Sequence, residues 1–367
     1  MNPQRIIVKL GTSVLTNETR RLSRQRVLEI VQQVAALHAQ GHEMVIVSSG
    51  AQAAGRERLH EPELSKSVPA KQMLSAVGQG RLMHVYSELF DIFQVIVGQV
   101  LLTRGDLSDR HRYLNARDTL TTLIDMRIVP IVNENDATAT EEIRVGDNDN
   151  LSALVANLLD ADLLVLLTDQ PGLYTADPRT DDSAELIPVV QKIDAATLAA
   201  AGGAGTSLGT GGMATKLQAA QLASRSGVTT VIAAGKEPNV LTRIVGGEAL
   251  GTRFERTTSH VESRKRWLLA EKPHGELLVD AGAVRALRTG GVSLLSVGVT
   301  EVRGEFTRGE PLAVVGPDGK RVAHGLTNYS STDVRQLCGT KSGKILEILG
   351  YTYGDAVIHR NNMILLD

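Results

Sequence analysis

The 367-residue sequence contains a single cysteine, Cys338, and its charges nearly cancel to a net charge of −2. One cysteine excludes an internal disulfide and suits a reducing compartment. The low net charge argues against a protein that coats nucleic acid or an anionic membrane. The nine histidines form no cluster with metal-ligand spacing. The amino terminus has only a short apolar run that ends at Lys9, so we expect no signal peptide, no membrane span and a cytoplasmic protein.

The sequence also lacks the common phosphate-binding loop, because no Gly-x-x-x-x-Gly-Lys-Ser/Thr run occurs in it. A different glycine-rich run is present, Gly209-Thr-Gly-Gly-Met-Ala-Thr-Lys216. Its backbone N–H groups suit phosphate oxygens, a helix that begins near Met213 would add its positive dipole end, and Lys216 adds a full charge. Glycine-rich runs are more often loops or linkers than nucleotide sites, so this one needs support from the rest of the chain.

Short apolar runs and helical patterns alternate along the first two thirds of the chain. Six runs rich in Val, Ile and Leu predict buried strands at residues 5–10, 44–47, 94–97, 128–132, 162–167 and 229–233. Between the first two, apolar residues fall on one face of a helix, followed by a stop at Gly41: Val27, Ile30, Val31, Val34 and Leu37. This alternation predicts an α/β fold with a mostly parallel sheet sandwiched between helices.

The residues that follow the predicted strands are small, polar or charged. They are Lys9-Leu-Gly-Thr-Ser13, Ser48-Ser-Gly-Ala51, Asn133-Glu-Asn-Asp136 and Thr168-Asp169. In sheets of this kind, ligands bind beyond the carboxyl ends of the strands. Independent loops would seldom share this character, so we expect these segments to form one site for phosphates and a polar substrate.

The composition of the chain changes after residue 235. A charged segment at 253–272 includes Arg264-Lys265-Arg266 beside the only tryptophan, Trp267, and a solvated linker explains it better than a nucleic-acid contact. Strand-like runs at 277–279, 311–315, 321–325 and 356–359 then alternate with turn residues. We therefore predict a first domain at 1–255, a linker at 256–274 and a small β-rich domain at 275–367.

The run Gly146-Asp-Asn-Asp-Asn150 precedes a helical pattern at 151–159. A calcium loop that started at Asp147 would need glycine at its sixth position and glutamate at its twelfth, where the chain has Ser152 and Leu158. These two departures argue against a calcium loop. Capping of the helix by Asn148 or Asp149 and a role in a site both stay open, and the two roles are compatible.

These motifs together resemble those of the glutamate 5-kinases, a group within the amino acid kinase family. The resemblance rests on Val8-Lys-Leu-Gly-Thr-Ser13, Ser48-Ser-Gly-Ala51, Asn133-Glu-Asn-Asp136, Gly146-Asp-Asn-Asp-Asn150, Leu167-Thr-Asp169 and Gly209-Thr-Gly-Gly-Met213. It extends over nearly the whole chain, and the part after about residue 275 is similar to the PUA domain that many bacterial members carry. A departure occurs at Gln52, where relatives usually have an aliphatic residue.

The resemblance implies an activity and its partners. It implies transfer of a phosphoryl group from ATP, with Mg²⁺, to the side-chain carboxylate of L-glutamate, which is the first step of proline biosynthesis. It also implies feedback inhibition by proline and assembly as a homodimer or homotetramer. It does not imply a membrane partner, and the balanced charges of 275–367 argue against nucleic acid.

The resemblance also implies roles for individual residues. Lys9, Lys216 and Asp149 are the catalytic candidates, with Asp149 orienting the two lysines. Ser49, Asp136 and Asn148 match positions that bind glutamate. The ATP-binding candidates are Lys9, Gly11, Thr168, Asp169, Thr210, Gly211, Gly212, Met213, Ala214, Thr215 and Lys216. No metal site built by the protein alone is expected, since magnesium would be held mainly by the nucleotide and water.

Two alternative functions stay open at this point. A kinase of the same fold acting on aspartate, N-acetylglutamate, carbamate or a nucleoside monophosphate is not excluded by the fold alone. An RNA-binding protein is suggested by the PUA resemblance, since such domains often bind RNA. The segment 199–207, rich in Ala and Gly, is a candidate flap over ATP or simply a poorly ordered loop.

Overall fold

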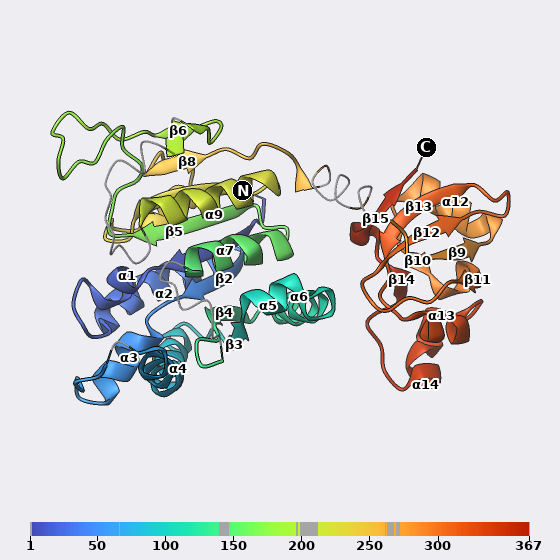
Figure 1. Cartoon of the computed structure of the whole chain (residues 1–367), viewed down its shortest axis with the longest axis horizontal. Coiled ribbons are helices and arrows are strands. Elements are labelled where there is room, and N and C mark those ends of the chain that lie inside the picture. Colours follow the sequence, from blue (N-terminus) through green and yellow to red (C-terminus); the bar gives the residue numbers. More distant parts are fainter. Residues whose placement is uncertain are drawn as a thin grey trace. The chain divides into compact units, whose positions relative to one another are not determined.

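The computed structural model describes residues 2–65, 67–138, 147–195, 197–198, 212–260, 262, 268 and 272–366. Several sequence predictions fall outside these residues, namely Gly146, the segment 199–207, Gly209, Thr210, Gly211 and the basic triplet with Trp267. The chain divides into two compact units, Met1–His260 and Val261–Asp367 (Figure 1). In the described part of the chain, every helix is too short or too polar to cross a bilayer.

The first unit is built on one eight-stranded sheet in the order β3-β4-β2-β1-β5-β7-β8-β6. All neighbouring strands from β3 to β7 are parallel, whereas β8 pairs antiparallel with β7. The strands are β1 (Arg5–Leu10), β2 (Glu43–Ser48), β3 (Val97–Leu102), β4 (Val129–Glu134), β5 (Leu163–Thr168), β6 (Val189–Val190), β7 (Thr229–Ala234) and β8 (Thr252–Phe254). The predicted mostly parallel sheet is therefore confirmed.

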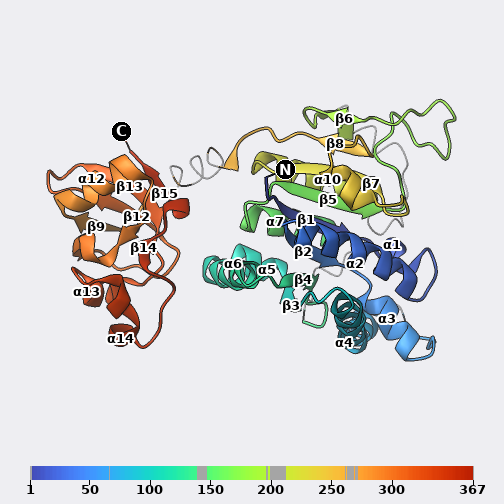
Figure 2. The same cartoon turned by 180° about the vertical axis from the view of Figure 1, so that it is seen from behind.

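Helices cover both faces of this sheet. Alternate residues of each strand point to opposite sides, and apolar residues on both sides are buried against helices. In β1, Ile6 and Val8 join one apolar cluster and Ile7 joins the other. The first cluster includes residues of α1, α2, α3, α4 and α10, and the second includes residues of α6, α7 and α9. Figure 1 shows α7 and α9 in front of the sheet, and Figure 2 shows α2 on the opposite side.

The helices of the first unit have the following bounds: α1 (Thr12–Thr16), α2 (Arg24–Ala39), α3 (Ala51–Arg58), α4 (Val68–Asp91), α5 (Arg104–Ser108), α6 (Arg110–Asp125), α7 (Asp147–Leu158), α9 (Met213–Arg225) and α10 (Val240–Val245). The helical face predicted between the first two strands is confirmed, since all five of its apolar residues are buried in α2. Gly41, with φ +95°, follows the end of that helix.

The third strand lies later in the chain than predicted. The apolar run at 94–97 begins with a turn, in which Gln94 has a φ of +56°, and only Val97 of that run belongs to β3. The strand continues through Gly98 and Gln99, which interrupt its apolar pattern. Because β3 is the edge strand of the sheet, most of its residues are only partly buried and the pattern is weak.

Helices α3 and α4 pack with their backbones in close contact, and two glycines make this contact. A Cβ atom at Gly78 would lie 1.8 Å from the carbonyl oxygen of Ala51, and one at Gly55 would lie 2.1 Å from that of Leu74. No side chain fits at these distances. The contact ties α4 to the start of α3, which directly follows the end of β2.

The second unit contains a five-stranded sheet in the order β11-β9-β12-β13-β15 and a short pair, β10-β14. The strands are β9 (Gly275–Val279), β10 (Leu294–Leu295), β11 (Val299–Arg303), β12 (Pro311–Val315), β13 (Arg321–Leu326), β14 (Ala356–Ile358) and β15 (Met363–Leu365). The described residues of this unit also form α12 (Ala281–Gly290), α13 (Ser331–Leu337) and α14 (Ile345–Leu349). The predicted β-rich character is confirmed, and four of these strands overlap the predicted runs.

Candidate active site

The carboxyl ends of four neighbouring strands lie level with one another in the first unit. Leu10 at the end of β1 pairs with Ser48 of β2 and with Leu167 of β5. In β2 and β4, Val47 pairs with Val132, which places Ser48 beside Asn133. The four polar segments that follow predicted strands therefore meet along one edge of the sheet.

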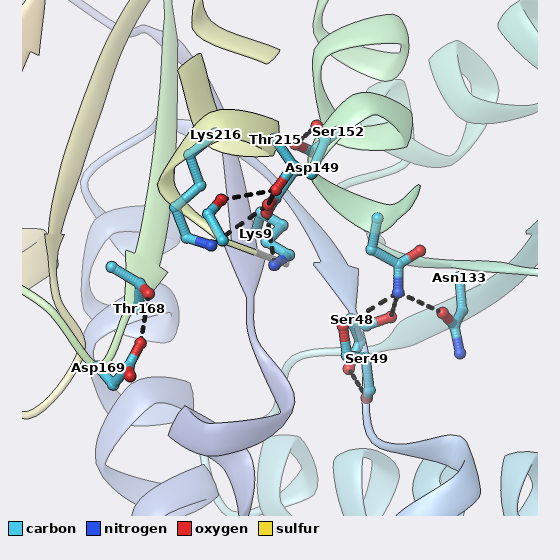
Figure 3. A network of polar contacts seen from close by, with 12 residues as sticks. Lys9, Ser48, Ser49, Asn133, Asp149, Ser152, Thr168, Asp169, Thr215 and Lys216 are labelled. Carbon is cyan, nitrogen blue, oxygen red and sulfur yellow. Dashed lines mark hydrogen bonds and ion pairs between the residues drawn. The ribbon is translucent and has the colours of Figure 1, made fainter. Parts of the chain in front are cut away.

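Three charged side chains come together at this edge. Lys9 extends from β1, Asp149 lies in the first turn of α7, and Lys216 lies in the first turn of α9. The Nζ atom of Lys9 is 2.6 Å from Oδ1 of Asp149, and the Nζ atom of Lys216 is 3.3 Å from Oδ2 (Figure 3). The carboxylate is fully buried, and the two lysine side chains are 8% and 6% exposed. One buried carboxylate thus separates two buried cations.

Burial and charge act against each other in this cluster. Burial lowers the pKa of Lys9, and the carboxylate of Asp149 opposes that effect. Burial alone would raise the pKa of Asp149, but the charges of Lys9 and Lys216 outweigh it and hold that pKa below its ordinary value. Two ammonium groups face one carboxylate in this cluster, so an added negative charge would be attracted to it. The cluster is therefore suited to an anionic ligand.

The start of α9 adds further donors beside this cluster. The hydroxyl of Thr215 lies 2.8 Å from Oδ2 of Asp149, and the hydroxyl of Ser152 donates to the backbone carbonyl of Asp149. The residue before the helix, Gly212, has no side chain to cap it, and a Cβ atom there would meet nothing within 4 Å. Met213 and Ala214 form the first turn with Thr215 and Lys216. Among the described residues, no side chain caps this helix start and no atom fills the space beside Gly212, which is a suitable position for a phosphate.

Thr168 and Asp169 lie on the β5 side of Lys9. The hydroxyl of Thr168 donates to Oδ1 of Asp169 at 2.8 Å, and the charge of Asp169 raises the pKa of Lys9 slightly against the effect of burial. Gly11 is the N-cap residue of α1, and its backbone N–H donates to the carbonyl oxygen of Leu167 with an N to O distance of 3.4 Å. These residues thus border the charged cluster on the side away from β2 and β4 (Figure 3).

The opposite side of the cluster is lined by uncharged polar groups. The Nδ2 atom of Asn148 donates to the carbonyl oxygen of Ser48, to Oγ of Ser49 and to Oδ1 of Asn133, at 3.0 to 3.1 Å. The Nδ2 atom of Asn133 in turn donates to Oε1 of Gln79 at 2.9 Å. Asn148 and Asp149 are consecutive in α7, so one helix turn supplies both the amide on this side and the carboxylate of the charged cluster.

Asp136 lies beyond the end of β4, where Oδ2 accepts a hydrogen bond of 2.9 Å from the hydroxyl of Ser75. Both Ser75 and Gln79 belong to α4, and sequence reasoning missed them, as it missed Asn133 as an individual site residue. In the sequence, the only signal for Ser75 and Gln79 is their spacing of four residues, which places two polar side chains on one face of a helix.

Most of the predicted site residues are thus gathered at one edge of the sheet. The charged candidates meet directly, the substrate candidates Ser49 and Asn148 are hydrogen-bonded to each other, and Asp136 lies on the neighbouring strand end. Thr210 and Gly211 lie outside the described residues. The sequence argues against the calcium alternative. Helix α7 begins at Asp147, so Asn148 and Asp149 lie inside its first turn, and their side chains bond to residues of the site. The capping role left open for them is therefore wrong.

Comparison with known proteins agrees with this arrangement. The model of the Amino acid kinase family matches residues 4–234, more than half of the chain. The chain belongs to the amino acid kinase family. A second model, that of the PUA domain, matches residues 275–349. The family match contains every described residue of the candidate site, and the PUA match falls within the second unit.

Relatives within the family match the chain over nearly its full length. A protein from Herpetosiphon aurantiacus named "Glutamate 5-kinase" is 55% identical over 98% of both chains, and one of the same name from Serratia marcescens is 54% identical over 99% of both. Among solved structures, carbamate kinase from Giardia lamblia bound to AMP-PNP is similar at a TM-score of 0.52 and 16% identity, covering 70% of this chain and 99% of that one. The last likeness shows the fold alone.

Proposed function

We propose that this chain transfers the γ-phosphoryl group of ATP to the side-chain carboxylate of L-glutamate, which gives L-glutamate 5-phosphate and ADP, the first step of proline biosynthesis. The buried cluster of Lys9, Asp149 and Lys216 is the observation that carries the transfer chemistry. The choice of glutamate is supported by the relatives named "Glutamate 5-kinase" that align with nearly the whole chain.

The reaction needs no general base. A glutamate side chain has an ordinary pKa of about 4.3, so it is already a carboxylate at neutral pH. One carboxylate oxygen forms the new bond to the γ-phosphorus, and the bond from that phosphorus to the β–γ bridging oxygen breaks, with its electron pair leaving on ADP. The obstacle is the approach of one anion to another, so catalysis depends on positioning and on fixed positive charge.

In this proposal the charged cluster meets the transferred phosphoryl group. Lys9 and Lys216 stabilise the negative charge that spreads over its oxygens, and Asp149 holds the two ammonium groups apart in a fixed geometry. The nucleotide lies along the remaining ATP-side candidates: Gly11, Thr168, Asp169, Thr210, Gly211, Gly212, Met213, Ala214 and Thr215. The N-terminal end of α9 contributes backbone N–H groups to its phosphates.

The acceptor amino acid lies on the β2 and β4 side of the cluster. We assign Asp136 to the α-ammonium group, since its carboxylate lies just beyond the end of β4 and can form a charge-assisted hydrogen bond. Ser49 and Asn148 supply hydrogen bonds to the oxygens of the substrate. This division puts the two substrates on opposite sides of Lys9, with the transferred group between them.

Magnesium accompanies ATP in this proposal and neutralises part of the phosphate charge when bound. The described residues contain no group of three or more His, Cys, Asp or Glu side chains that could hold a metal ion. We propose that nucleotide oxygens and water, rather than a protein cage, hold this ion.

We further propose a cytoplasmic enzyme that assembles as a homodimer or homotetramer and is inhibited by proline. A single cysteine suits a reducing compartment. Glutamate saturation curves measured with and without proline test the inhibition, and identical curves would rule it out. Sedimentation of the purified chain tests the assembly, and a monomer at assay concentrations would contradict it.

A direct test compares acceptors. We expect ATP-dependent formation of an acyl phosphate with glutamate, trapped by hydroxylamine as the hydroxamate, and little product with aspartate or N-acetylglutamate. Release of ADP is measured in parallel with carbamate and with UMP as acceptors, which do not give a stable hydroxamate. Turnover of one of these other acceptors without turnover of glutamate would reject the proposed substrate while leaving phosphoryl transfer intact.

A further inference from the structure

Helix α4 carries a row of buried polar side chains that face the acceptor side of the site. Ser75, Gln79 and Tyr86 are separated by four and seven residues, so they lie on one face of the helix. Ser75 donates to Asp136, Gln79 accepts from Asn133, and the hydroxyl of Tyr86 lies 2.8 Å from that of Ser48. Each of the three thus bonds to a residue at or just beyond the end of β2 or β4.

The hydrogen bonds between the amides have a fixed direction. The backbone carbonyl of Ser48 can only accept, so the atom of Asn148 that faces it must be Nδ2. That Nδ2 atom also donates to Oδ1 of Asn133, which accepts the backbone N–H of Glu134 as well. The other amide atom of Asn133 is therefore its donor, and Oε1 of Gln79 is its acceptor.

This chain of amides ends in two unmatched atoms. Within the described residues, Oδ1 of Asn148 and Nε2 of Gln79 are buried and have no hydrogen-bond partner. Buried polar atoms without partners cost free energy, and natural structures keep few of them. The hydroxyl of Ser49 accepts from Asn148, which turns its own hydrogen away from that amide.

We propose that Gln79 is a positioning residue for the acceptor amino acid. It holds Asn133, which holds Asn148, and Asn148 sets the orientation of the Ser49 hydroxyl that donates to an oxygen of the substrate. The inference rests on the proposed function, because that function places the acceptor at Ser49 and Asn148. It extends the acceptor site to α4, an element whose residues none of the motifs contains.

The test is a double-mutant cycle on the full chain. Gln79→Met keeps the length of the side chain and removes its amide, and we expect the KM for glutamate to rise about tenfold, which corresponds to about 1.4 kcal/mol. The KM for ATP and kcat at saturating glutamate should change less than about threefold, since the charged cluster is untouched. In the double variant with Asn148→Ala, the KM should match that of Asn148→Ala alone, because Gln79 acts through Asn148.

A matched control separates positioning from general stability. Gln33 of α2 is an equally buried amide that bonds to the backbone N–H of Leu241 and to the carbonyl oxygen of Glu29, and none of these residues belongs to the candidate site. We expect Gln33→Met to lower the melting temperature without changing the KM for glutamate. If Gln79→Met yields no folded protein, Gln79→Asn replaces it, since it keeps an amide but is one methylene too short.

Three results would overturn the proposal: an unchanged KM for glutamate in folded Gln79→Met, parallel increases in the KM values for glutamate and ATP, or additive effects in the cycle. Failure of the proposed function is recognised separately, because the wild-type chain would then turn over another acceptor. The same cycle measured with that acceptor decides the role of Gln79, and additive effects there would reject it.

Discussion

The two sides of the candidate site hold their residues by different physical means. On the ATP side, a buried carboxylate fixes two buried cations. On the acceptor side, amides and hydroxyls hold one another, and a serine hydroxyl holds the carboxylate of Asp136. Charge is strong and long-ranged in a buried site, while amide hydrogen bonds are weaker and directional. From this difference we infer that the charged cluster stabilises the transferred group, whereas the acceptor side selects the acceptor molecule by its hydrogen-bonding groups.

The largest effect should come from removing the cations. We expect Lys9→Ala and Lys216→Ala each to lower kcat by about a thousandfold or more, because each removes a fixed charge from a water-poor site. The exposed lysine variant Lys320→Ala, in the second unit, is the control and should leave kcat unchanged. Steady-state kinetics with saturating ATP and glutamate provide the measurement. Near-normal turnover in both buried variants would show that the charged cluster is not the reacting centre.

A smaller effect is expected from neutralising the carboxylate between the cations. Asp149→Asn should lower kcat by about a hundredfold, because the two ammonium groups would repel each other and lose their fixed geometry. The pKa of Lys9 should fall further, since the carboxylate that opposes the effect of burial is gone. Lysine loses its proton above its pKa, so the alkaline decline of kcat/KM should move to lower pH. If the decline stays at the wild-type pH, deprotonation of Lys9 is not its cause.

The acceptor side should respond in KM rather than in kcat. We expect Asp136→Ala to raise the KM for glutamate by tens of fold, about 2 kcal/mol, because it removes a charge-assisted contact with the α-ammonium group. Ser75→Ala should raise it only a few fold, since Asp136 would keep its charge and lose one orienting donor. Measured KM values for ATP serve as the internal reference. A larger effect of Ser75→Ala than of Asp136→Ala would reverse the proposed order of these residues.

The sequence predicted the frame of the site well because the frame depends on local patterns. The first strand was predicted at its observed bounds, and the polar residues at strand ends follow from the geometry of parallel sheets. The third strand was misplaced because Gly98 and Gln99 break its apolar pattern at the sheet edge. Strand β8, which pairs antiparallel with β7, was not predicted, since three residues are too few to show the pattern of a strand.

The contacts behind the site could not be predicted in the same way. Ser75, Gln79 and Tyr86 are ordinary residues in a helical sequence, and they become informative only when the fold brings α4 against the ends of β2 and β4. Asn133 was quoted within a motif, but its place between Asn148 and Gln79 depends on three elements far apart in the chain. Tertiary packing, not propensity, decides such bonds.

The glycine contact between α3 and α4 has a consequence for how this region tolerates change. Glycine inside a helix costs about 1 kcal/mol relative to alanine, so Gly55 and Gly78 each weaken the helix that contains them. Alanine at either position would improve the helix in isolation, yet its methyl group has no space against the opposing backbone. A stabilisation strategy based on helix propensity alone would therefore include these two positions, and at both it would push α4 away from the loops that α4 supports.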